Sequence, residues 1–234
     1  MSAEDFDSRV ARVAALAEPV RSALYRYVVA QPGPVSREQA AAAVGVARHV
    51  AKFNLDKLEE EGLLEAEFAR PAGRRGPGAG RPAKLYKRSS REVEVSIPER
   101  HYDLAGQVMA EAITSTERDA VPIREALRSA ARLAGQLLGE EARNQVGARP
   151  SRAARFRAVQ NVLSAKGYEP RAAGNGLSLA NCPFHTLAQS YASLICEING
   201  NLIDSMLDTA GLRDAHAELR PAENMCCVRI TEPR

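Results

Sequence analysis

Four cysteines and a histidine near the C-terminus are the side chains of this 234-residue chain best suited to hold a metal. Cys182 ends a predicted strand, Cys196 lies in the following predicted helix, and Cys226 and Cys227 lie on the last predicted strand. His185, three residues after Cys182, offers a nitrogen. Thiolate and imidazole are ligands of zinc and iron. This placement could bring three thiolates together, although no CxxC pair is present, and buried structural cysteines are the alternative.

The adjacent cysteines Cys226 and Cys227 cannot both point the same way on a strand. Side chains alternate between the two faces, so Cys226 shares a face with Val228, and Cys227 shares the other with Arg229. We therefore expect only one of the pair to face the helix that carries Cys196.

Basic side chains are concentrated in the N-terminal part, although the net charge is only +3. Residues 1–91 hold 16 Lys and Arg against 11 Asp and Glu, whereas residues 92–234 hold 16 against 18. The stretch 68–91 has no acidic residue and eight basic ones: Arg70, Arg74, Arg75, Arg81, Lys84, Lys87, Arg88 and Arg91. Such a block is either a solvated loop or a nucleic-acid contact.

The elements before this block predict a helix-turn-helix. Helical periodicity over 5–16 and 18–30 is followed by a capping box, Ser36 with Gln39, at the start of a short helix over 37–44. Gly45 forms the turn, and a further helix covers 47–61. Its inward side is Val46, Ala51, Leu55 and Leu58.

Two predicted strands, 64–69 and 83–89, with a Gly/Pro/Arg loop over 71–82 between them, add a wing. The outward residues of the second helix would meet base edges in the major groove, with Arg48 on a guanine. His49 and Lys52 would touch phosphates or bases, and the arginines of the wing would hold the backbone or enter the minor groove. The candidate DNA-binding residues are Ser36, Arg48, His49, Val50, Lys52, Phe53, Arg74, Arg75 and Arg81.

Residues 46–64 together with Gly80-Arg81-Pro82-Ala83-Lys84-Leu85-Tyr86 resemble the recognition helix and wing of the ArsR/DeoR-like winged-helix repressors. The likeness covers about 90 residues. It implies binding to double-stranded DNA, with repression as the expected sense of control, and such proteins usually bind two half-sites as dimers.

Two long helices are predicted next, over 100–116 and 123–144. The second carries Leu127, Ala130, Leu133, Leu137 and Leu138 on one side, which favours either a homodimer seam or a core helix within the chain. We expect a DNA-binding domain over 1–91, a helical linker and dimerisation region over 92–148, and a sensor domain over 149–234.

The last 83 residues predict a small α+β module, so the whole chain is expected to have an α+β fold. Helices are expected over 152–166 and 186–209. Strands are expected over 168–173, 177–181, 216–220 and 225–231, and Asn175-Gly176 is a hairpin turn between the first two.

Residues 181–185, 194–197 and 225–230 resemble the sensor domain of iron-sulfur-sensing Suf-operon repressors and, more distantly, vinyl-4-reductase-like small-molecule domains. The Suf pattern implies an iron-sulfur cluster and favours Cys226 as the ligand nearest Cys196. A further cysteine of that pattern is replaced here by residues 208–211, Asp-Thr-Ala-Gly. Either His185 or Cys227 must then supply the fourth ligand, or the metal is zinc, or none binds.

These features together predict a DNA-binding transcriptional repressor controlled by an iron-sulfur cluster or metal. The alternative is a winged-helix regulator that senses a small organic ligand, with structural or zinc-binding cysteines. No nucleophile elbow, P-loop, dinucleotide fingerprint or HExxH suggests an enzyme. Neither a signal peptide nor an apolar run of 18 residues is present, so we expect a cytoplasmic protein with no membrane partner.

Overall fold

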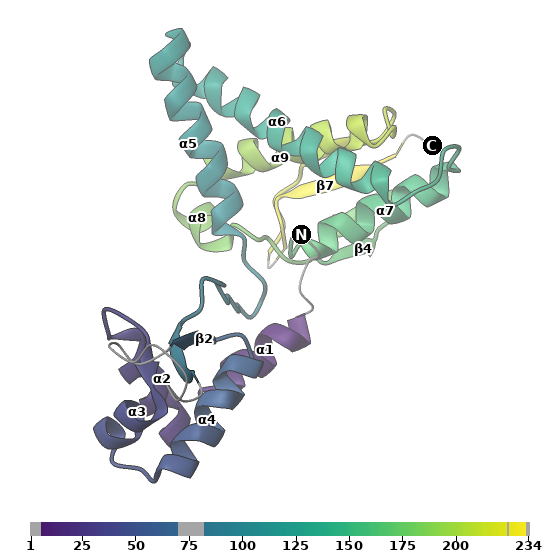
Figure 1. Cartoon of the computed structure of the whole chain (residues 1–234). Helices are drawn as coiled ribbons and strands as arrows, with labels where there is room; N and C mark the ends of the chain where they lie inside the picture. The colour runs from purple at the N-terminus through teal and green to yellow at the C-terminus, as the bar shows by residue number, and fades with distance from the viewer. Residues whose placement is uncertain (1–5, 70–81, 224, 233–234) are drawn as a thin grey trace. The chain divides into compact units, whose positions relative to one another are not determined.

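The computed structural model of the chain describes residues 6–69, 82–223 and 225–232. It divides into two compact units, Met1–Val95 and Ser96–Arg234. Each combines helices with one small antiparallel sheet, as the expected α+β class requires (Figure 1). Among the described residues, no helix is long and apolar enough to cross a membrane.

The N-terminal unit contains four helices and a three-stranded sheet among its described residues. The helices are α1 (Phe6–Ala15), α2 (Pro19–Val29), α3 (Arg37–Val44) and α4 (Arg48–Glu60). The strands are β1 (Val35–Ser36), β2 (Leu64–Ala69) and β3 (Ala83–Arg88), in the order β1-β3-β2. The predicted bounds of α3 and β2 agree with the structure residue for residue.

Local signals explain where these helices begin and end. The Glu18 carboxylate accepts hydrogen bonds from the first-turn amides of α2, whose first residue is Pro19. The predicted capping box is present at α3: Gln39 N donates to Ser36 Oγ at 3.2 Å, and Ser36 N donates to Gln39 Oε1 at 2.9 Å. Gly45 then ends α3 with a φ of 73°, a left-handed conformation that favours glycine.

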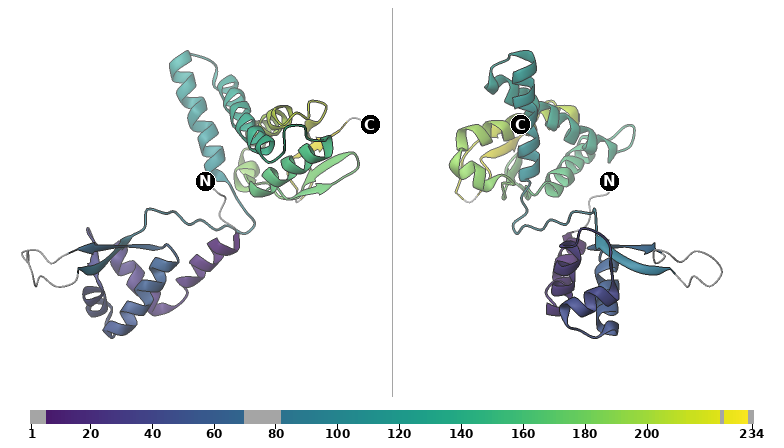
Figure 2. Two further views of the ribbon diagram at one scale, coloured as in Figure 1. Left: turned by 45° about the vertical axis from the view of Figure 1, so that its right-hand side comes forward. Right: turned by 60° about the vertical axis from the view of Figure 1, so that its left-hand side comes forward.

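The C-terminal unit begins with two long helices, α5 (Tyr102–Asp119) and α6 (Ile123–Asn144). The remaining helices are α7 (Arg152–Ala165), α8 (His185–Ser190) and α9 (Ala192–Thr209). Its strands are β4 (Pro170–Ala172), β5 (Gly176–Leu179), β6 (His216–Leu219) and β7 (Val228–Thr231), all antiparallel in the order β4-β5-β7-β6. The views of Figure 2 agree that α6 lies alongside α9 and that α5 lies alongside α6.

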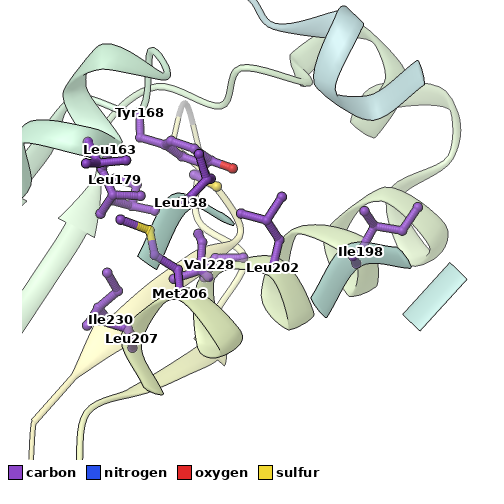
Figure 3. Close-up of a cluster of buried hydrophobic side chains, with 14 of the residues drawn as sticks. Leu138, Leu163, Tyr168, Leu179, Ile198, Leu202, Met206, Leu207, Val228 and Ile230 are labelled. Carbon is purple, nitrogen blue, oxygen red and sulfur yellow. The ribbon is translucent and has the colours of Figure 1, made fainter. Parts of the chain in front are cut away.

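One apolar core holds this unit together. Figure 3 shows side chains of α9 and β7 meeting residues from α6, α7 and the hairpin: Leu138, Leu163, Tyr168, Leu179, Ile198, Leu202, Met206, Leu207, Val228 and Ile230. Because α5 and α6 share this core with the cysteine-bearing segments, the division predicted near residue 148 does not separate two compact units.

Two glycines let α6 approach α9 closely. A methyl group on Gly135 would clash with the Leu202 carbonyl oxygen, and one on Gly139 would lie 2.5 Å from Thr209 Cβ. The side of α6 that faces the core therefore runs through Gly135 and Gly139. The prediction that Leu133 and Leu137 share that side is wrong, because their side chains are 50% and 61% exposed.

The single helix predicted over 186–209 is also wrong. It is broken into α8 and α9 at Tyr191, whose φ of −134° and ψ of 47° are not helical. The predicted hairpin between β4 and β5 is present, but its turn is Gly174-Asn175 rather than Asn175-Gly176, since Ala173 N donates to Gly176 O and Gly176 begins β5.

Candidate nucleic-acid interface and cysteine cluster

Helix α4 packs through one side and leaves the opposite side open. Ala51, Leu55 and Leu58 are fully buried, as predicted. Asn54 is also buried: its amide donates to Val50 O, and its Oδ1 accepts a hydrogen bond from Arg21 Nε at 3.1 Å. This bond joins α4 to α2, so the inner side of α4 is fixed by both apolar and polar contacts.

The outward residues of α4 are those expected to meet DNA. Arg48, His49 and Lys52 are exposed, Phe53 is 66% exposed, and Val50 is half-buried. Among the described residues no side chain caps α4, so the amides of its first turn remain open to an acceptor such as a phosphate. The exposed side thus combines cations, hydrogen-bond donors and an apolar ring.

Two of these cations have acidic neighbours within the domain. Arg48 Nη2 lies 2.5 Å from Glu38 Oε1, with both side chains about half exposed, and Lys52 Nζ lies 2.8 Å from Asp56 Oδ2. Exposed pairs of this kind contribute only about 0.2–1 kcal/mol each. Breaking these two ion pairs so that Arg48 and Lys52 can contact DNA would therefore cost little free energy.

A polar network joins α4 to wing strand β3. The Tyr86 hydroxyl donates to Asp56 Oδ1 at 2.6 Å, and Lys84 Nζ donates to the same oxygen at 2.7 Å and also to Glu59. Tyr86 is 1% exposed, whereas the Asp56 side chain is about one-third exposed. Lys84 belongs to the acid-free basic stretch, but in the structure its charge serves to hold the wing against α4.

The protonation of this network follows from its contacts. Partial burial disfavours the charged form of Asp56, but hydrogen bonds from Lys52, Lys84 and Tyr86 outweigh that effect and hold its pKa well below the usual value. Burial, with the bond to Asp56, raises the pKa of Tyr86. Asp56 is therefore an anion throughout the neutral range.

The remaining predicted DNA contacts divide into two groups. Ser36 is half-buried, and its hydroxyl oxygen accepts the capping bond of α3. Arg74, Arg75 and Arg81 lie outside the described residues. The strands on either side of that segment, β2 and β3, pair in one continuous antiparallel register from Leu64↔Arg88 to Ala69↔Ala83.

Residues 16–67 match the family model described as a helix-turn-helix domain. The N-terminal unit is the winged helix-turn-helix domain of a DNA-binding transcription regulator. The match spans α2 to β2, which includes the capped α3, the Gly45 turn and all of α4. Comparisons with curated proteins and with solved structures find no match.

The C-terminal unit of this regulator brings its four cysteines together as two neighbouring pairs. Cys196 of α9 and Cys227, just before β7, form a disulfide with a Cα–Cα distance of 6.3 Å. Cys182 and Cys226 are buried free thiols, and the Cys226 thiol hydrogen-bonds to the sulfur of Cys182.

The expectation that only one of the adjacent cysteines would face the helix that carries Cys196 is wrong: Asn199 of α9 donates to Cys226 Sγ, and Cys227 is bonded to Cys196 of the same helix. The predicted alternation is present: Cys226 is buried on the same face as Val228, and Cys227 is only half-buried. Cys196 is itself only half-buried, at the rim of the core, so the outward Cys227 reaches it.

A buried hydrogen-bond chain leads from the core to the free thiols. The Tyr168 hydroxyl donates to Asn199 Oδ1 at 2.6 Å, and Asn199 Nδ2 donates to Cys226 Sγ at 3.2 Å. The Cys226 thiol lowers the pKa of Cys182 to about 7, against the effect of burial and with help from the Phe184 amide. The same contact and burial raise the pKa of Cys226. At neutral pH the Cys182 thiol is therefore partly ionised, while the Cys226 thiol stays protonated and donates its hydrogen bond to Cys182.

The donors for a metal are incomplete while the disulfide is present. In the described part of the chain, no group of three or more His, Cys, Asp or Glu side chains is arranged to hold a metal ion. His185 is exposed at the first residue of α8 and joins no such group. Only two thiols remain, fewer than the four ligands of a structural zinc or of a typical iron-sulfur cluster. Reduction would complete a set of four soft sulfur donors.

Sequence reasoning missed Asp56, Lys84 and Asn199. Asp56 and Glu59 stand three residues apart on α4, which places both carboxylates on one side of the helix, and that spacing could have predicted a basic partner. The partner strand becomes known only from the fold. Asn199 lies in an otherwise apolar stretch of α9, and such a polar residue is a signal for a buried hydrogen-bond network.

Proposed function

We propose that this regulator is a sequence-specific, cytoplasmic repressor rather than an enzyme, and that its C-terminal unit controls DNA binding through an iron-sulfur cluster or another metal. The observation that carries the DNA-binding part is the exposed outer side of α4 beside a wing strand fixed to it by Asp56. The observation that supports the sensor part is the convergence of all four cysteines from three segments.

The proposed contacts to DNA follow from the side-chain chemistry of α4. Arg48 is the candidate for a bidentate bond to guanine, and Phe53 for an apolar contact with a thymine methyl group. His49 and Lys52 are candidates for phosphate or base contacts, and Arg74, Arg75 and Arg81 for the backbone or the minor groove.

The proposed cofactor would be held by Cys182, Cys196, Cys226 and Cys227 as thiolates, with His185 as the alternative fourth ligand. A bound cluster or metal would supply a crosslink between α9, the segment that follows β5 and the segment that precedes β7. Asn199 and the amides of Phe184 and Val228 would donate hydrogen bonds to the ligand sulfurs, as outer-shell groups commonly do.

The regulator is further proposed to act as a homodimer. Leu133 and Leu137 stand one turn apart on the exposed side of α6 and offer an apolar surface for a second copy. In a dimer, a change in the C-terminal units would alter the spacing of the two DNA-binding domains and release the operator.

The DNA-binding part is tested by selecting duplexes from a random pool with the full chain and measuring affinities by fluorescence anisotropy. Arg48→Ala should weaken binding to the selected duplex by about 1–3 kcal/mol, roughly 5- to 150-fold, with little change in binding to unrelated duplex. Arg213→Ala removes an equal charge from a side chain 86% exposed in the other unit and serves as the control. Equal losses in both variants would contradict the proposed base contact.

The sensor part is tested on protein purified without oxygen. Iron, sulfide, zinc and visible absorbance are measured, and operator DNA is titrated before and after cofactor removal. We expect cofactor loss to weaken operator binding, and a His185→Ala control to keep the cofactor if the four cysteines are its ligands. Colourless, zinc-free protein with unchanged affinity would contradict the proposed control.

A further inference from the structure

The two cysteine pairs differ in how easily a solute can reach them. Cys196 and Cys227 line an open surface hollow together with Arg128 of α6. Cys182 and Cys226 are only 6% and 4% exposed. A small thiol can therefore reach the disulfide from solvent, whereas the free thiol pair is shielded by the core.

The disulfide and a metal compete for the same sulfur atoms. Cys196 and Cys227 are 31 residues apart in sequence, and their Cα separation of 6.3 Å lies within the usual range for a disulfide. Each of these sulfurs is either bonded to its partner or available as a thiolate ligand. With the bond formed, only Cys182 and Cys226 are left to bind a metal.

From this geometry we infer that Cys196–Cys227 is a reversible disulfide whose state determines whether the four thiols are available to a metal. The inference rests on the proposed function for the identity of the ligand. A dithiol reductant attacks one sulfur from the hollow, and a mixed disulfide forms while the other sulfur leaves as a thiolate. The second thiol of the reductant then displaces the protein sulfur. Two electrons and two protons pass to Cys196 and Cys227, and the reductant becomes a disulfide. A low-molecular-weight disulfide drives the reverse reaction.

The residue next to Cys196 connects this disulfide to α6. Glu197 accepts hydrogen bonds from Arg128 Nε at 2.5 Å and from Arg124 Nη1 at 3.3 Å. Cys196 and Glu197 are adjacent in the second turn of α9, so opening the bond to Cys227 removes a covalent constraint beside Glu197. Redox change at the hollow is thereby coupled to the helix that bears the proposed dimer surface.

The test uses the full chain equilibrated in dithiol/disulfide buffers of graded potential. Thiols are alkylated in denaturant and mapped by mass spectrometry. We expect two alkylated cysteines, Cys182 and Cys226, in the oxidised form and four in the reduced form, with a linked Cys196–Cys227 peptide only in the former. Cys182→Ser should keep the linked peptide, and Cys227→Ser should lose it.

Metal binding is then measured by titrating Co²⁺ anaerobically into each form and following the thiolate-to-cobalt absorbance. We expect binding to the reduced form and none to the oxidised form. Four alkylated cysteines at every potential, or equal cobalt binding by both forms, would overturn the inference. A redox-dependent disulfide with no metal bound to the reduced form supports the switch and contradicts the metal-based control instead.

Discussion

The network that holds the wing strand to the recognition helix gives a quantitative prediction. Asp56→Ala leaves the buried Tyr86 hydroxyl without the acceptor that now lies at 2.6 Å, a loss of about 1–3 kcal/mol. Lys84 keeps its contact with Glu59, and the exposed Lys52 pair adds roughly 0.3–0.5 kcal/mol. We therefore expect the N-terminal unit to be destabilised by about 2 kcal/mol.

Hydrogen-deuterium exchange by mass spectrometry measures this effect in the full chain, because peptides from α4 and β3 report on the N-terminal unit alone. A loss of about 2 kcal/mol corresponds to a roughly 30-fold fall in protection. Tyr86→Phe removes only the hydroxyl, so the double variant should lose less than the sum of the two single losses. Additive losses, or a change below about twofold in Asp56→Ala, would refute this account of the wing.

The difference in unfolding free energy between the wild type and Asp56→Ala is expected to depend on pH in a defined direction. The folded-state pKa of Asp56 is lowered, so its contribution is fully present above the unfolded-state pKa of about 4 and is lost as the pH falls through the folded-state value. In denaturant unfolding, the difference in unfolding free energy between the wild type and Asp56→Ala should be constant from about pH 8 to 5 and should become smaller below about pH 4. A difference in unfolding free energy that becomes larger as the pH falls would contradict this account of Asp56.

Two glycine substitutions, each compared with a control glycine, give further tests. Gly135→Ala forces a methyl group onto α9 and should destabilise the C-terminal unit by about 1–3 kcal/mol in calorimetry. Its control is Gly106→Ala in α5, where the new group meets no atom within 4 Å apart from the backbone of its own helix, and which should stabilise the unit by up to about 1 kcal/mol. Gly45→Ala should lower the free energy of unfolding in urea by about 1–2 kcal/mol, because Gly45 has a positive φ. Gly33 lies in open space and does not have a positive φ, so Gly33→Ala should be close to neutral.

Local signals predicted the helix-turn-helix well because its determinants are close in sequence. The Ser36–Gln39 box, the Gly45 turn and the spacing of Ala51, Leu55 and Leu58 each depend on neighbours within one or two turns. The same reasoning was only partly right for α6: of the five residues that it placed on one side, Leu127, Ala130 and Leu138 are buried, whereas Leu133 and Leu137 are exposed. Glycines, which carry no hydrophobic signal, mark the true contact because α9 approaches them closely.

Pairing of the cysteines could not be predicted in the same way. Alternation correctly separated Cys226 from Cys227, but which of them reaches Cys196 depends on where α9 lies over the sheet. The Asp56 network has the same limitation, since Lys84 and Tyr86 come near α4 only when β3 folds back against it. Contacts between distant segments depend on the tertiary fold, which local periodicity does not specify.

Selection of DNA by the full chain tests the recognition role of α4 most directly. The wild-type protein and the Arg48→Ala and Phe53→Ala variants are each incubated with a random duplex pool in dilute buffer, and the retained DNA is sequenced. We predict that the wild type enriches one short motif, and that each variant still retains duplex but loses preference at particular positions of that motif. Failure of the wild type to retain duplex, or an identical motif from all three proteins, would contradict the assignment.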